Sequence, residues 1–170
     1  NRVRRQRQMC IRDSANIDGL TISHVDHDGI RSTGSIDITA ANIDDVSGGI
    51  HSSGDIVLTD ATFSNAGVGL ALAGGTADVE ELEFTTGVGN ALTISSGVSG
   101  DVDGMEGDAT NAVVSIDSTG FSVSNIDMSG ERLVNSWSAG DLAISDSSFF
   151  ADSPETPIDL RTSGTVTLSN

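Results

Sequence analysis

The chain has 170 residues, of which 8 are basic and 25 acidic, so its formal net charge is −17. This charge argues against a nucleic-acid partner, since phosphates are bound by Lys and Arg, and the sequence contains no Lys. A single Cys excludes a disulfide framework, and no run of 18 apolar residues is present to span a membrane.

Residues 1–14 differ in composition from the rest of the chain. They hold five of the eight basic residues and the single Cys, Cys10. Arg4–Ser14, RRQRQMCIRDS, resembles the in-frame translation of a transposon-based sequencing adapter. We therefore expect residues 1–14 to be non-native and disordered and to pack on nothing, and the chain to be a metagenomic fragment. Without this segment, whose five Arg and one Asp carry a net charge of +4, the formal charge changes from −17 to −21.

From Ala15 onward the sequence is one repeat of about 21 residues. After each repeat start, apolar residues follow at offsets 0, +2, +5 and +7, as in Ile36, Ile38, Ala41 and Ile43. The alternation indicates short strands with one buried face, and the extra residue before +5 indicates a corner. A triplet of small residues ends each repeat in a glycine, which we expect to supply a positive φ. These glycines are Gly34, Gly54, Gly75, Gly97, Gly120, Gly140 and Gly164.

This pattern predicts a triangular coil that cannot fold without its neighbours. It resembles the right-handed parallel β-helix of the pectate-lyase-like superfamily over Ala15 to Asn170. We therefore predict an all-β, single-stranded solenoid over residues 15–170, with three short strands per coil and about seven coils, truncated at both ends. A left-handed helix would need strict 18-residue coils, which the intervals exclude.

The motif Asn16-Ile17-Asp18-Gly19, together with Asp44-Asp45, is similar to the carboxylate set of polygalacturonase-type β-helices. The repeat makes Asp18 equivalent to Thr39 and Asp44 equivalent to Ser23. The two carboxylates therefore fall on different sides of the coil. We expect no active site here, and interpret these residues as corner positions that bond the backbone.

The densest polar cluster is His24–Asp28, HVDHD, which ends at a glycine. His and Asp together can bind zinc or transfer protons, but they are also ordinary residues of a corner. One coil further on, His51 aligns with Arg31, and we expect the two side chains to form a polar surface pair.

One outward column, between offsets +5 and +7, is acidic over three consecutive coils. Neighbours in a column are about 4.8 Å apart, so their carboxylates repel unless they turn into solvent or share a cation. Ca²⁺ accepts hard oxygen ligands in irregular geometry. The sequence therefore predicts a weak Ca²⁺ site, the alternative being a solvated acidic stripe. Its ligands would be Glu83, Glu106, Asp108 and Asp127.

The register places Phe149 in the core and does not assign Phe150 or Trp137 to either face. Exposed aromatic rings can bind sugars, but one or two of them do not make a sugar platform. No catalytic residues or organic cofactor are predicted. The leading hypothesis is a structural, adhesive or ligand-display segment of an extracellular or cell-surface protein. Its expected partners are carbohydrate, other surface proteins, and the remaining coils of its own full-length chain. The alternative is a fragment of a polysaccharide-active β-helix enzyme whose catalytic coils lie outside this piece.

Overall fold

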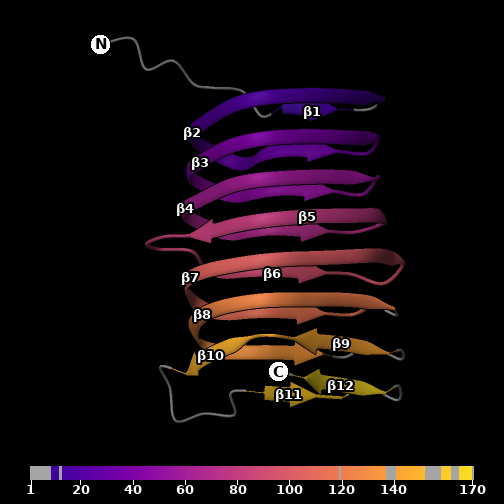
Figure 1. The fold of residues 1–170 in the computed structure, drawn as a ribbon. Coiled ribbons are helices and arrows are strands. Elements are labelled where there is room, and N and C mark those ends of the chain that lie inside the picture. Colours follow the sequence, from indigo (N-terminus) through magenta and orange to yellow (C-terminus); the bar gives the residue numbers. More distant parts are fainter. Residues whose placement is uncertain are drawn as a thin grey trace.

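The computed structural model describes residues 9–11, 13–118, 120–136, 141–151, 158–161 and 165–169. These residues form strands and turns, with no helix among them. Figure 1 shows the strands stacked as successive coils along one axis. The strands are β1 (Met9–Ile11), β2 (Ser14–Ser32), β3 (Ser35–Ser52), β4 (Ile56–Leu72), β5 (Gly75–Phe84), β6 (Asn90–Ile94), β7 (Val98–Ile116), β8 (Phe121–Ser136), β9 (Leu142–Ser145), β10 (Ser148–Ala151), β11 (Ile158–Leu160) and β12 (Val166–Ser169).

Every strand pair is parallel, and each coil pairs with the coil about 21 residues further along the chain. Ile36, for example, lies opposite Ile56, and Ile56 opposite Ala77. The predicted all-β parallel solenoid of about seven coils is confirmed. Because parallel strands bond through their backbones, each coil satisfies the polar groups of the next.

The division of a coil into three segments is clearest near the C-terminus. There β9, β10 and β11 pair with three successive parts of the single strand β8. In the same way, β5 and β6 pair with two parts of β4. Elsewhere the segments of one coil run on through the corners as one long strand of 16 to 19 residues.

The interior is a continuous column of apolar side chains. Ile38, Leu58 and Val79, at the +2 offset, are each 0% exposed. Phe63 and Phe84, at the +7 offset, stack with ring centroids 5.3 Å apart and planes at 12°. The expected inward positions of the central coils are therefore confirmed.

The inward assignment weakens at both ends of the described coils. Ile17 and Leu20 are partly buried and pack against the core. In β11, the apolar side chains of Ile158 and Leu160 are 40% and 36% exposed. They lie uncovered because no further coil of the described residues pairs with β11 beyond it.

One corner of the coil has a constant backbone conformation. At the +4 offset, the residue is left-handed in all seven described coils, which makes a column of positive φ angles. The column comprises Gly19, Ala40, Asp60, Glu81, Gly104, Asn125 and Asp146, with φ between 49° and 83°. The glycines at the repeat ends are less uniform than predicted. Gly75, Gly97 and Gly120 have positive φ, whereas at Gly54 a Cβ would lie 2.5 Å from the Gly34 carbonyl oxygen.

The prediction that residues 1–14 pack on nothing is wrong for Met9–Ile11 and for Ser14, which begins β2 opposite Ser35. Residues 1–8 and 12 lie outside the described part. Met9–Ile11 form β1, which pairs in parallel with Ile30–Ser32 of β2. A sheet edge binds backbone groups and does not select side chains, so any extended segment can pair with it.

Candidate functional site

The predicted acidic column is present in the pairing. Thr21, Asn42, Thr62, Glu83, Glu106, Asp127 and Ser148 are successive partners. The four predicted Ca²⁺ ligands also line one shallow pocket of about 420 Å³, together with the exposed ring of Phe150. The predicted acidic surface is therefore present in the structure. The residues that make it up are Glu83, Glu106, Asp108 and Asp127.

Two of the four carboxylates, Glu83 and Asp108, accept hydrogen bonds from hydroxyl groups of neighbouring coils. Thr62 Oγ1 donates to Glu83 Oε2 at 3.2 Å, and Ser129 Oγ donates to Asp108 Oδ1. Across the described part of the chain, no three His, Cys, Asp or Glu side chains gather closely enough to hold a metal ion. The Ca²⁺ site therefore stays a prediction that requires these side chains to move together.

The two carboxylates of the glycosidase-like motif occupy the positions predicted for them. Asp18 lies opposite Thr39, and Asp44 opposite Ser23, so the two belong to different columns of the coil. Asn16 Nδ2 donates to Asp37 Oδ2 at 3.1 Å, a polar contact between adjacent coils.

Asp44 forms a brace across two coils. It accepts hydrogen bonds from Ser64 Oγ at 2.6 Å and from Asn65 Nδ2 at 2.9 Å. These two bonds, first from Ser64 and then from Asn65, lower the pKa of the Asp44 carboxyl. Asn65 has φ of +47°, so the brace fixes a left-handed corner.

The same brace recurs at the other corner. There Asp103 accepts from Ser124 Oγ at 2.8 Å and from the amide of Asn125, which has φ of +53°. A related contact lies before the first strand of the coil. The Thr76 backbone N–H and hydroxyl both donate to Asp55, at 2.9 and 2.8 Å, and lower the pKa of its carboxyl. Many of the acidic residues therefore stabilise coil-to-coil stacking.

The cluster His24–Asp28 divides into two parts. His24 is left-handed, and its Nε2 lies 3.6 Å from Asp45 Oδ2 on the next coil. Beyond it the register shifts between Val25 and Asp28, where β2 has one residue more than β3. His24 therefore contacts Asp45, whereas Asp28 contacts Arg31 and His51, so the five residues do not act as one site.

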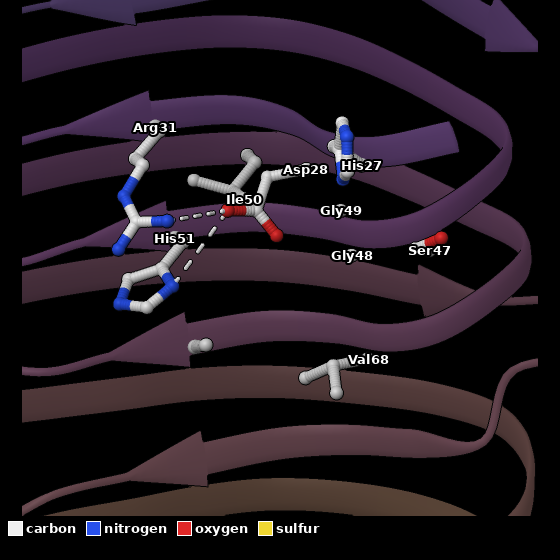
Figure 2. A pocket seen from close by; sticks show the side chains of 10 residues that line it. His27, Asp28, Arg31, Ser47, Gly48, Gly49, Ile50, His51 and Val68 are labelled. Carbon is white, nitrogen blue, oxygen red and sulfur yellow. Dashed lines mark hydrogen bonds and ion pairs between the residues drawn. The ribbon is translucent and has the colours of Figure 1, made fainter. Parts of the chain in front are cut away.

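Asp28 instead joins the predicted pair of Arg31 and His51, which are opposite each other in the ladder. Asp28 Oδ2 lies 3.4 Å from Arg31 Nη1 and 3.9 Å from His51 Nδ1. Figure 2 shows the three side chains converging at one side of a pocket of about 410 Å³, with His27 at the other.

Gly48 leaves room in this pocket for the Asp28 carboxylate, because a Cβ there would lie 2.5 Å from Asp28 Oδ1. A Cβ at the neighbouring Gly49 would instead meet the Gly69 carbonyl oxygen at 2.2 Å and the buried Phe63 ring at 2.7 Å, so Gly49 allows the coils to pack closely. The repeat predicts the Arg31–His51 pair, but it does not predict Asp28 as the third member. The available signal was the pair Gly48-Gly49, one coil after Asp28.

The two neighbouring aromatic residues Phe149 and Phe150 lie on opposite sides of the coil wall. Phe149 is partly buried and packs against the core, as expected. Phe150 is 69% exposed and lies at the edge of the acidic pocket. Trp137 lies outside the described residues.

No protein-family model, curated protein or solved structure matches this chain. Among the described residues, no helix is long and apolar enough to cross a membrane.

Proposed function

We propose that this chain is a structural, adhesive or ligand-display segment of an extracellular or cell-surface protein. The observation that carries this proposal is the regular ladder. The same outward positions repeat from coil to coil, so surface side chains stand in straight columns about 4.8 Å apart. Such columns offer a partner many equivalent contacts on a rigid support.

The use of polar side chains supports the same proposal. Asp44, Asp103 and Asp55 contact the backbone or side chains of an adjacent coil. Their carboxylates therefore have a structural role at the corners and turns. The right-handed winding and the relation to the pectate-lyase-like superfamily are part of this proposal, as is a high-salt environment that screens the acidic surface.

The test is an assay of the full 170-residue chain against a panel of neutral and acidic polysaccharides. We would measure new reducing ends, the absorbance of unsaturated uronates, and co-sedimentation with insoluble polymer. The expected result is no bond cleavage, with any retention independent of time. Turnover that is lost in Asp18→Asn or Asp44→Asn would overturn the proposal in favour of the enzyme alternative.

A further inference from the structure

We propose that Arg31 and His51, held by Asp28, form a binding site for an oxyanion: a phosphate, sulfate or carboxylate group. This goes beyond the structural role, which rests on the ladder and would remain if no anion bound.

Arg31 and His51 share one anchor, the carboxylate of Asp28. Asp28 Oδ2 faces one nitrogen of each partner, Arg31 Nη1 at 3.4 Å and His51 Nδ1 at 3.9 Å. Asp28 is the least exposed of the three side chains, at 24%, against 33% for His51 and 54% for Arg31. The carboxylate therefore lies behind the two donors and fixes their orientation, as an outer residue orients a ligating histidine.

Arg31 and His51 each have a further nitrogen that does not face Asp28 (Figure 2). Figure 2 shows another terminal nitrogen of Arg31 and the second ring nitrogen of His51 pointing away from Asp28, on the same side. Arg31 and His51 are direct partners in adjacent coils, so these two nitrogens belong to neighbouring positions. Charge-assisted donors arranged in this way match the oxygens of an oxyanion.

The pocket of Arg31 differs from other surface pockets in the charge of the side chains that line it. In three further pockets of the described surface, the charged lining groups are all carboxylates, as in the pocket of Glu83, Glu106 and Asp127. The pocket of Arg31 holds a guanidinium and two imidazoles beside one carboxylate. On a chain of charge −17, it is the pocket among these four that complements a negative group.

The pocket has room for such a group. Its volume is about 410 Å³, and Gly48 adds no side chain to its lining. The apolar atoms of Ile50, Val68 and Ala71 also line it, so the group that carries the anion can contact an apolar surface. When it is protonated, His51 donates from both ring nitrogens, so one can face Asp28 while the other reaches the anion. The other titratable or charged groups that line this pocket are His27, Asp28 and Arg31.

The test is a titration of the full 170-residue chain with sodium sulfate, phosphate and acetate, at constant ionic strength set with chloride. NMR would follow the ring nitrogens of His51 and the Nε–H of Arg31. We expect saturable shifts in the millimolar range, with binding stronger at pH 6 than at pH 8. Binding of sulfate and phosphate alone identifies a tetrahedral ligand, binding of acetate alone identifies a carboxylate, and binding of all three identifies a site for oxyanions in general.

The variants separate the site from general charge effects. Arg31→Gln and His51→Gln should each weaken binding about tenfold, and Arg31→Lys should restore part of it. Arg132→Gln, which removes the same charge from an exposed position of β8, should leave binding unchanged. The proposal is overturned if shifts do not saturate, or if Arg31→Gln and Arg132→Gln change the dissociation constant equally. Far-UV circular dichroism confirms that each variant is folded.

Discussion

The two halves of each coil differ in how they tolerate a change of length. The first half, a strand, a corner and a second strand, pairs residue for residue without a shift, as Ile36–Ile43 does with Ile56–Phe63 and then Ala77–Phe84. The turn that closes the coil varies. Ser52 and Ile56 are four positions apart, whereas Ile94 and Gly100 are six positions apart.

The difference follows from what lies on either side of each bend. The first corner is a left-handed residue between two inward positions, so one extra residue would turn the next side chain outward. The closing turn is mostly exposed, so an extra residue there only lengthens a loop. Part of the variation in coil length is therefore placed in an exposed loop, and the rest lies in the second half of the coil, as between Val25 and Asp28.

The largest expected effect comes from an insertion in the first corner. One Gly inserted after Asp60 should displace Ala61 and Phe63, which are 1% and 0% exposed, and abolish the cooperative thermal transition. The control is one Gly inserted after Gly74, in the closing turn, which should leave the midpoint within a few degrees. Circular dichroism melting measures both. Equal midpoints for the two variants would contradict the claim that the first corner tolerates an extra residue less well than the closing turn.

The next effect is overpacking between coils. In Gly49→Ala the new Cβ would lie 2.7 Å from the Phe63 ring and closer still to the Gly69 carbonyl oxygen. The free energy of unfolding should therefore fall by about 3 kcal/mol. In Gly29→Ala, in the same column, the nearest neighbour of the new Cβ lies at 3.1 Å, so the free energy of unfolding should fall by clearly less. Denaturant unfolding compares them, and a larger loss for Gly29→Ala would contradict the stacking.

A smaller effect tests the left-handed column directly. Ala40 has φ of +58°, a conformation that costs a non-glycine residue about 1 kcal/mol, so Ala40→Gly should stabilise the chain. Gly19→Ala, at the equivalent corner with φ of +69° and no atom near the new Cβ, should destabilise it by a similar amount. Changes of the same sign in the two variants would exclude this explanation.

The corner braces predict a dependence on acid. The pKa of Asp44 and the pKa of Asp55 are both lowered from 3.8, so the folded state binds these protons less readily than the unfolded state. Their stabilisation is complete above about pH 4 and is lost as the pH falls through the lowered values. Asp44→Asn should flatten this acid dependence of the melting temperature, whereas Asp26→Asn, an exposed aspartate outside the braces, should retain it.

The smallest expected effect concerns the acidic column. Glu106→Gln with Asp127→Asn should raise stability at low salt by roughly 1 kcal/mol, because it removes repulsion between adjacent carboxylates. Calorimetric titration of wild type with Ca²⁺ should give weak, saturable heat in the millimolar range, reduced in the double variant. Glu131→Gln is the control. Heat that is absent, or unchanged in the double variant, would leave the solvated stripe as the explanation.

The first half of the coil is the part that the sequence predicts well. Inward residues such as Ile38 and Leu58 recur at a constant offset, so the column of Glu83, Glu106 and Asp127 follows by counting. Arg31 and His51 align in the same way. Asp28 escapes prediction, because one extra residue between Val25 and Asp28 shifts the register within a single coil.

Other features escape prediction because side chains do not encode them. Ala40 adopts a left-handed corner for which its own type has no preference, since the neighbouring coils impose it. Met9–Ile11 form a strand that pairs with β2, and backbone pairing of this kind has no side-chain signature in the sequence. The exposure of Ile158 depends on what covers the last described coil, which the apolar pattern cannot specify.

The direction of the hydrogen bonds has a mechanical consequence. In a stack of coils these bonds run along the axis, so a pulling force on the two ends of the chain loads only the outermost ladder at any moment. Each step would release one coil of about 21 residues, or roughly 70 Å of extended chain. Such a chain lengthens in steps of nearly equal size, which would let it absorb tension repeatedly between two attached surfaces.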